Sequence, residues 1–158
     1  MGEFAIGKTS LTARYVRQTF SDKYLTTVGV KIDSKLVELP GQETVKLVIW
    51  DIAGSDTLAM VDEKYLRGTA AVLLVADGCR KSSLETAMKL RKLTLDVVGE
   101  CPMVLAVNKV DLQPNWEITD EDISDISKDG LQVYLTSAKT GENVEIVFQR
   151  LASLLITQ

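Results

Sequence analysis

The feature that most constrains this chain is the segment Gly-Glu-Phe-Ala-Ile-Gly-Lys-Thr at residues 2–9, which runs directly into a helical pattern. The segment satisfies the phosphate-loop pattern G-x-x-x-x-G-K-[ST]. Its glycines allow successive N–H groups to face phosphates, and the helix that follows adds the positive end of its dipole. Lys8 can supply charge to the outer phosphates, and the Thr9 hydroxyl is a hard oxygen ligand for Mg²⁺. This motif alone does not choose between ATP and GTP.

Strand-like and helix-like periods alternate along the rest of the chain. We expect helices over residues 8–19, about 57–67, 83–98, a short stretch opening at Thr119, and 143–156. We expect strands over residues 28–38, 45–50, 70–76, 103–107 and 131–135, the first two joined as a hairpin through the turn at 40–43. Such alternation predicts an α/β domain: a mostly parallel sheet with one antiparallel edge strand and helices on both faces. We find no linker or repeat, so residues 1–158 are interpreted as one domain.

Three further motifs each follow an expected strand. They are Asp-Ile-Ala-Gly at 51–54, Asn-Lys-Val-Asp at 108–111 and Ser-Ala-Lys at 137–139. Ligands bind at the carboxyl ends of the strands in sheets of this kind, which is where all three motifs fall. Asp51 can hold a water bound to Mg²⁺, and Gly54 permits its N–H to approach a terminal phosphate. Each motif is common as a random match, but four in order at strand ends are not.

The motif at 108–111 favours guanine. The Asp111 carboxylate can accept from both the ring N–H and the exocyclic amine of guanine, and adenine offers no such pair of donors. The stem of Lys109 can lie over the base, and Asn108 can tie its loop to the phosphate loop. The Ala138 N–H can donate to the guanine carbonyl oxygen. These features argue against an ATP-using phosphotransferase, which shares the phosphate loop.

The four motifs together resemble those of Ras-like small GTPases, and the match covers essentially the whole chain. Several stretches look like the Rab branch: residues 27–30, 46–51, 65–68 and 137–144. The resemblance implies a P-loop NTPase G domain that binds GTP or GDP with Mg²⁺. Its first switch would run from about Phe20 to Thr27, and its second from Gly54 to about Arg67. Phe20 would pack on the base edge, although it can equally be read as a hydrophobe that anchors its loop.

The resemblance carries site residues over to this sequence. Those implied to contact nucleotide are Gly2, Glu3, Phe4, Ala5, Ile6, Gly7, Lys8, Thr9, Ser10, Phe20, Thr27, Gly54, Asn108, Lys109, Asp111, Ser137, Ala138 and Lys139. Those implied at Mg²⁺ are Thr9, Thr27 and Asp51, and those implied in catalysis are Lys8, Thr27, Gly54 and Ser55.

The implied function is a molecular switch that hydrolyses GTP to GDP. The γ-phosphate would gather Thr27 and Gly54, and hydrolysis would release both. Effector, exchange-factor and GTPase-activating proteins would bind the two switches, with effectors on the surface around residues 28–32, Trp50 and Tyr65. The net charge of −4 argues against nucleic acid as a partner. Two cysteines, without a signal peptide or prenylation cysteine, indicate a cytoplasmic chain without a membrane anchor, and we expect both cysteines to be buried.

Three positions depart from the family pattern. Only Met1 precedes Gly2, where the family has an apolar strand between the strands at 45–50 and 70–76. The chain is therefore interpreted as an N-terminally incomplete domain that lacks its first strand. Ser55 stands where a Gln usually orients the attacking water, so hydrolysis is expected to be slow. Phe4 stands at the phosphate-loop position nearest the γ-phosphate, which is often small.

These departures leave two alternatives to a GTP-hydrolysing switch. One is a module that binds GTP or GDP with little or no hydrolysis, for which Phe4 and Ser55 are the sequence evidence. The other is the GTPase domain of a longer regulatory protein. Single-turnover hydrolysis separates the binding module from the switch.

Overall fold

The computed structural model describes residues 1–23, 26–39, 41, 44–53 and 63–156 of the chain. In chain order the elements are α1 (Lys8–Arg17), β1 (Val30–Glu38), β2 (Thr44–Ile52), the 3-10 helix η2 (Glu63–Tyr65), β3 (Val72–Asp77), α2 (Lys81–Val98), β4 (Met103–Asn108), the 3-10 helix η3 (Val110–Asn115), α3 (Asp120–Lys128), β5 (Gln132–Thr136) and α4 (Val144–Ile156).

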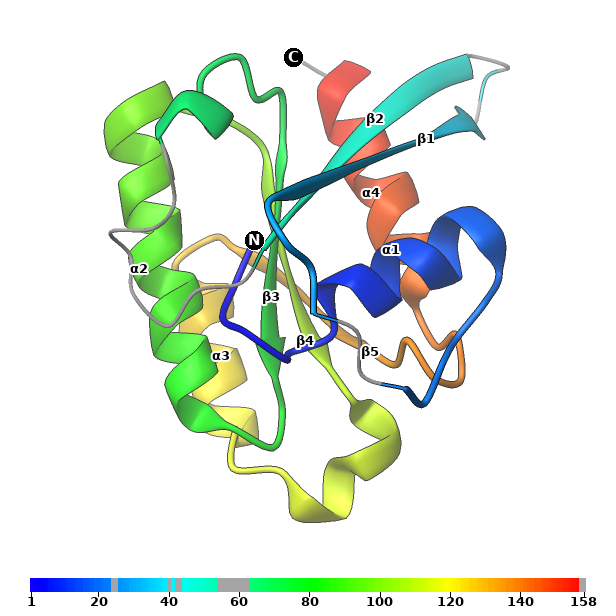
Figure 1. Cartoon of the computed structure of the whole chain (residues 1–158). Coiled ribbons are helices and arrows are strands. Elements are labelled where there is room, and N and C mark those ends of the chain that lie inside the picture. Colours follow the sequence, from blue (N-terminus) through cyan, green and yellow to red (C-terminus); the bar gives the residue numbers. More distant parts are fainter. Residues whose placement is uncertain (24–25, 40, 42–43, 54–62, 157–158) are drawn as a thin grey trace.

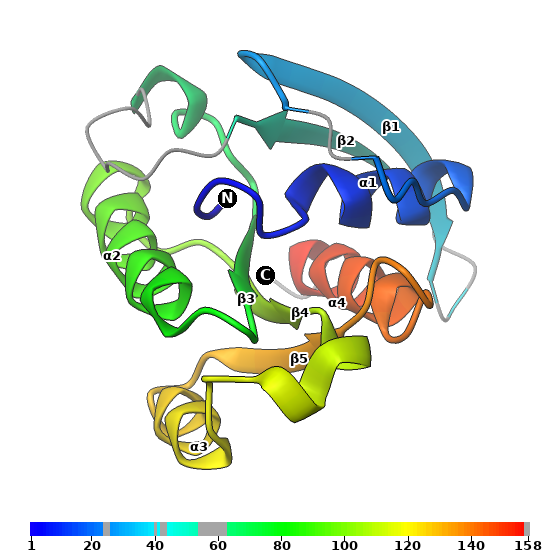
Figure 2. The ribbon, with the colours of Figure 1, turned by 60° about the horizontal axis from the view of Figure 1, so that its bottom comes forward.

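A parallel sheet in the order β3-β4-β5 forms the centre of the molecule (Figure 1). Its strands are in register, with Leu74 opposite Leu105 and Ala106 opposite Tyr134. One face packs on α2 and α3 through a core that includes Leu74, Leu90 and Leu105, and the other packs on α1 and α4. Figure 2 shows the two pairs of helices on opposite sides of the strands. The expected helices on both faces of a parallel sheet are therefore confirmed.

Strands β1 and β2 form an antiparallel hairpin that is a separate sheet. Side chains rather than backbone hold it to the rest: Val37 and Leu39 join a core cluster with the α1 and α4 residues Leu11, Tyr15 and Phe148. The rings of Tyr15 and Phe148 stack with their centroids 4.0 Å apart at 7°. The hairpin can therefore be docked on these helices without any strand pairing to β3.

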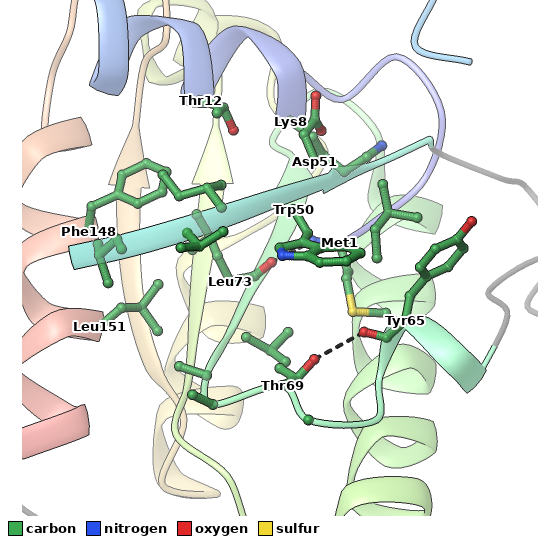
Figure 3. A pocket seen from close by; sticks show the side chains of 18 of the residues that line it. Met1, Lys8, Thr12, Trp50, Asp51, Tyr65, Thr69, Leu73, Phe148 and Leu151 are labelled. Carbon is green, nitrogen blue, oxygen red and sulfur yellow. Dashed lines mark hydrogen bonds between the residues drawn. The ribbon is translucent and has the colours of Figure 1, made fainter. Parts of the chain in front are cut away.

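A cavity of about 460 Å³ lies between β2 and β3. Figure 3 shows Met1 inside it, with Phe148 and Leu151 of α4 at one end and Tyr65 at the other. The Met1 ammonium donates to the Leu73 carbonyl at 2.6 Å, and the Met1 carbonyl accepts from the Val75 N–H at 2.8 Å. This is the pattern of a parallel ladder. The first residue thus sits where the expected first strand would end, and among the described residues it is the one that pairs with this edge of β3.

Protonation of the Met1 amino group costs free energy in this buried position. Burial, with a smaller contribution from the Lys8 ammonium, lowers its pKa to about 5. An amide in the same place would make the ladder hydrogen bond without that cost.

Most expected elements are found with ends shifted by at most two residues. Thr119 caps α3 as expected, and its hydroxyl accepts from the Asp122 N–H in a capping box. The hairpin is not hydrogen-bonded to β3 among the described residues, which agrees with the expectation that the strand between those at 45–50 and 70–76 is lacking. Burial of the two cysteines is wrong, since Cys79 and Cys101 are half-buried. Of the helix expected over about 57–67, residues 57–62 lie outside the described residues and 63–65 form the 3-10 helix η2.

No helix among the residues that the structure describes is long and apolar enough to cross a membrane.

Candidate nucleotide-binding site

The phosphate loop, residues 2–9, bends tightly at its two glycines. Gly7 has φ +95°, and a Cβ there would lie 2.3 Å from the Asn108 side-chain nitrogen. A Cβ on Gly2 would lie 2.4 Å from the Val75 carbonyl oxygen. Both positions therefore need glycine on steric grounds. The Gly7 carbonyl accepts from the Leu11 N–H at 2.8 Å, so the loop leads without interruption into α1.

Four successive carbonyl oxygens of this loop each accept a side-chain donor. The pairs are Lys8 to Glu3 at 2.5 Å, Arg80 to Phe4 at 2.6 Å, Lys109 to Ala5 at 3.4 Å and Asn108 to Ile6 at 3.0 Å. In a trans peptide the N–H points opposite to the C=O, so the three donors from outside the loop, all but Lys8, direct the N–H groups of the peptides that they hold inward. A loop held in this way is prepared to bind an anion before the anion arrives. The arrangement fits phosphate.

The three residues expected at Mg²⁺ converge on one point. The Thr9 hydroxyl lies 2.5 Å from the Thr27 hydroxyl and donates to the Asp51 carboxylate at 2.5 Å. Asp51 is buried at the carboxyl end of β2, and Thr9 opens α1. Hard oxygens are the ligands that Mg²⁺ prefers, and two hydroxyls with one carboxylate leave room for waters and phosphate oxygens. The donor set fits Mg²⁺, which Thr9 and Thr27 would hold directly and Asp51 through water.

Asn108 ties the two ends of the site together. It is buried at the end of β4, and besides donating to Ile6 it accepts from the Thr136 hydroxyl at 3.3 Å and from the Ala138 N–H at 3.2 Å. The expected link between this motif and the phosphate loop is confirmed. The Ala138 N–H, expected to face a guanine oxygen, is directed at Asn108 in this structure.

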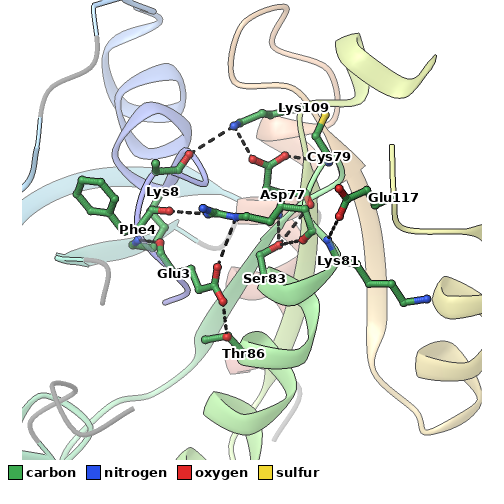
Figure 4. Close-up of polar contacts among 12 residues, drawn as sticks. Glu3, Phe4, Lys8, Asp77, Cys79, Lys81, Ser83, Thr86, Lys109 and Glu117 are labelled. Atoms are coloured by element: carbon green, nitrogen blue, oxygen red, sulfur yellow. Dashed lines mark hydrogen bonds and ion pairs between the residues drawn. The ribbon is translucent and has the colours of Figure 1, made fainter. Parts of the chain in front are cut away.

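Asp111 and Ser137, from the two base-recognition motifs, are hydrogen-bonded. The Ser137 hydroxyl donates to the Asp111 carboxylate at 2.6 Å, which orients it. Asp111 is exposed, so a base could reach it from solvent. Lys109 has φ +71° and its ammonium lies 2.5 Å from the buried Asp77 carboxylate. This pair and the bond to Ala5 hold the side chain of Lys109 along the site (Figure 4).

The structure places the remaining expected residues unevenly. Ser10 lies half-buried in α1, and the Lys139 carbonyl accepts from the Arg14 guanidinium at 2.5 Å. Phe20 is half-buried and packs against the core cluster around α1 and α4, as an anchoring hydrophobe does. Gly54 and Ser55 lie outside the described residues.

Sequence reasoning missed Asp77, Arg80 and Trp116. Asp77 ends β3 and could have been noticed, because carboxyl ends of strands are where such sites form. Trp116 donates from its ring to the Lys109 carbonyl at 2.9 Å and packs against Gly78. No local pattern points to Arg80, since its partner Phe4 lies 76 positions away in the chain.

With this geometry in place, the comparisons with known proteins decide the family. The Ras family model matches residues 1–157. The chain belongs to the Ras family. It resembles mouse Ras-related protein Rab-17, with 36% identity over 99% of this chain and 73% of the relative. Rat Ras-related protein Rab-7L1 is 32% identical over 92% of this chain and 74% of its own length. Arabidopsis Ras-related protein RABA2b is 31% identical over 97% and 72%.

The chain is thus a Rab-like small GTPase of the Ras superfamily, with the P-loop GTPase fold. The family binds guanine nucleotides, typically with Mg²⁺. Within the described part of this Rab-like chain no three His, Cys, Asp or Glu side chains gather as a metal cluster.

Proposed function

We propose that this chain binds GTP and GDP through residues 2–9 and the motifs at 108–111 and 137–139, and that it switches a protein surface when GTP is hydrolysed. One observation carries the proposal. The four successive carbonyl contacts on the phosphate loop come from the phosphate-binding Lys8, from the base-recognition residues Asn108 and Lys109, and from α2. Hydrogen bonds therefore join the phosphate loop to the base-recognition motif at 108–111 before a ligand binds.

Base selection is assigned to Asp111. Its carboxylate, oriented by Ser137, would accept two hydrogen bonds from guanine, while adenine would leave it unpaired beside a ring. The stem of Lys109 would cover one face of the base. The bond from the Ala138 N–H to Asn108 is long, at 3.2 Å, so this N–H can be shared with a guanine oxygen.

Mg²⁺ would supply charge compensation for the β- and γ-phosphates when it is bound. Lys8 would leave the Glu3 carbonyl for the phosphates, to which a cation is attracted more strongly than to a neutral oxygen. Thr27 and Gly54 would be drawn in by the γ-phosphate and released on its loss. This makes the segments that carry them the switching elements.

The surface read by effectors is proposed around Trp50 and Tyr65. Their rings lie 6.4 Å apart at 54°, and Trp50 is 52% exposed. Ile32, which is opposite Trp50 in the hairpin, and Val28 are exposed as well. Exposed aromatic and branched side chains next to a switch suit a protein partner. Exchange and GTPase-activating proteins would act on the same switches.

Hydrolysis is proposed to be slow. Ser55 carries its hydroxyl on one carbon, too short to orient the attacking water as a Gln would. Phe4 is 37% exposed, and Figure 4 shows its ring extending away from α2, so it can crowd a partner's approach to the γ-phosphate. A module that binds nucleotide without turnover is the second candidate, favoured by the same two residues. We propose a cytoplasmic setting, where GTP is abundant.

A single-turnover assay tests the proposal. The protein, in excess over nucleotide, is loaded with GTP in the presence of Mg²⁺. Chromatography then measures how much GTP has been converted to GDP over time. Slow conversion that stops on removal of Mg²⁺ is expected of the switch. Binding without any conversion selects the nucleotide-binding module, and absence of binding rejects both.

A further inference from the structure

Among the described residues, Arg80 is the side chain that donates to a backbone carbonyl of the phosphate loop from outside both the loop and the base-recognition motifs. It is the residue that caps the N-terminus of α2. Its guanidinium donates to the Phe4 carbonyl at 2.6 Å, and its Nε lies 3.4 Å from the Glu3 carboxylate. One planar guanidinium therefore contacts a backbone oxygen and a side-chain oxygen of consecutive loop residues.

Glu3 is itself held from α2. The Thr86 hydroxyl, almost two turns along that helix, donates to the other oxygen of the Glu3 carboxylate at 2.5 Å. The side chain of Glu3 is only 11% exposed, so this carboxylate needs both partners to offset its lost hydration. Figure 4 shows Glu3 and Thr86 facing one another between the loop and the helix. The phosphate loop is thus attached to α2 at two points.

The backbone that carries Arg80 is fixed as well. Its carbonyl accepts from the Ser83 hydroxyl at 2.6 Å, and its N–H donates to the Asp77 carbonyl at 2.9 Å. Ser83 is fully buried, and its hydroxyl oxygen also accepts a hydrogen bond from the Asp77 N–H at 2.8 Å. The guanidinium therefore projects from a rigid strand-to-helix corner, which limits the entropy lost when it contacts the loop.

The peptide that Arg80 holds matters for phosphate binding. Because C=O and N–H point in opposite directions across a trans peptide, holding the Phe4 carbonyl toward α2 points the Ala5 N–H away from α2. Ala5 has φ +62°, a conformation that an alanine adopts only when its surroundings impose it. The contact from Arg80 is one such constraint, and the contact from Lys109 to the Ala5 carbonyl is the other.

We propose that Arg80 is a positioning residue of the nucleotide site: with Glu3 and Thr86 it fixes the peptide between Phe4 and Ala5, turns the Ala5 N–H toward bound phosphates, and so slows nucleotide release. This rests on the proposed binding of guanine nucleotide. Nucleotide retention in this chain would then depend on α2, outside the two switches. A partner that displaces Arg80 from the loop would promote nucleotide exchange.

The test measures the dissociation rate of fluorescent GDP with Mg²⁺ from the full chain and three variants. Arg80→Ala removes both contacts and should release GDP about tenfold faster, the order expected for losing a charge-assisted hydrogen bond. Arg80→Lys keeps the charge but has no planar fork, so it should restore only part of the retention. Lys81→Ala is the matched control, because Lys81 is the next cation in α2 and pairs with Asp122 instead.

A double-mutant cycle separates positioning from a general effect on folding. Glu3→Gln should speed release in the parent and have little effect in the Arg80→Ala background, since the two residues act as a unit. Melting of the nucleotide-free proteins is recorded alongside. If Arg80→Ala melts early, Arg80→Lys carries the test.

The outcomes distinguish this inference from the function on which it rests. A parent that does not retain GDP overturns the proposed function. A parent that retains GDP, with Arg80→Ala and Lys81→Ala releasing it at equal rates, overturns the role of Arg80 alone. Additive effects of Glu3→Gln and Arg80→Ala would also overturn it.

Discussion

The two halves of the site are built on different foundations. The base end stands on β4 and β5, adjacent strands of a continuous parallel sheet, and its residues are hydrogen-bonded to one another through Asn108. The Mg²⁺ end depends on the β1–β2 hairpin, which a cavity of about 460 Å³ separates from β3. Thr9 joins the hairpin to α1 through Asp51 and Thr27. The base end is thus fixed by backbone pairing between strands, and the Mg²⁺ end by contacts between side chains.

This difference fits the proposed division of work. A base-recognition surface has to be the same with GTP and GDP, so it gains from a rigid sheet. A switch has to respond to one phosphate, so its contacts must be few and local. Substitutions at the base end should therefore change affinity strongly, and those at the hairpin end should change rates and coupling more gently.

The largest expected effect is at the base end. Asp111→Asn replaces two acceptors by one acceptor and one donor, so GTP affinity should fall by at least about 100-fold, or roughly 3 kcal/mol. Xanthine nucleotides, which present the complementary pattern, should bind the variant better than the parent. Isothermal titration with GTP and XTP measures both. Asp125→Asn, at an exposed acid that pairs with Lys128, is the matched control. Unchanged GTP affinity in Asp111→Asn would mean that base recognition lies elsewhere.

Lys8 stands where the two halves meet, and its loss should affect binding rather than folding. The Lys8 ammonium donates to the Glu3 carbonyl, and a hydrogen bond of this kind is worth about 1 kcal/mol. Lys8→Ala should thus leave the melting temperature of nucleotide-free protein nearly unchanged. It should lose most of the roughly 2.7 kcal/mol that GDP gives at 100 times its Kd. Melting curves with and without GDP and Mg²⁺ decide this, with Lys89→Ala as control. Equal GDP-induced shifts in parent and variant would reject the assignment.

At the hairpin end the expected effect is on the chemical step. A Ser55→Gln, Phe4→Gly double variant should hydrolyse GTP about 10-fold faster than the parent, because a water-orienting amide is restored and the ring is removed. Single-turnover rates measure it, and the two single variants show which change matters. A parent as fast as the double variant would show that another residue positions the water.

The smallest expected effect concerns the Met1 amino group in the cavity between β2 and β3. Burial lowers the pKa of the Met1 ammonium to about 5 from 8.0. Between these values the unfolded chain holds a proton that the folded chain lacks, so stability should rise with pH from about 5 to 8. The gain is limited to about 1 kcal/mol, because the terminal residue can leave the cavity at the cost of its hydrogen bonds. The chain has no histidine, which keeps this window clear.

Urea unfolding at pH 5.5 and 8 measures this contribution. The same chain with its terminus acetylated has no ammonium to titrate and is the control. If both forms show the same pH dependence, the Met1 ammonium is not buried between β2 and β3. A chain extended before Met1 by alternating apolar residues should also be more stable, since its added backbone could continue the ladder along β3.

Most of the fold could be predicted from local patterns in the sequence. The buried strands, the cap at Thr119 and the closing helix were all predicted, because each depends on neighbours within a few residues. The phosphate loop and the motif at 108–111 were predicted because their chemistry needs fixed spacing. The site contacts that could not be predicted are those between positions far apart in the chain: the bond from Arg80 to Phe4 spans 76 positions, and Trp116 packs against Gly78. The separation of the hairpin from β3 was predicted, because only Met1 precedes the phosphate loop.

Competition between guanine and adenine nucleotides tests the account most directly. The parent chain is loaded with fluorescent GDP and Mg²⁺, and unlabelled GDP, GTP and ADP are titrated against it. Because Ser137 orients the Asp111 carboxylate and Asn108 holds the phosphate loop, we predict that GDP and GTP displace the label and that ADP does so only at concentrations at least about 100-fold higher. Displacement by ADP at the same concentration as GDP would contradict it.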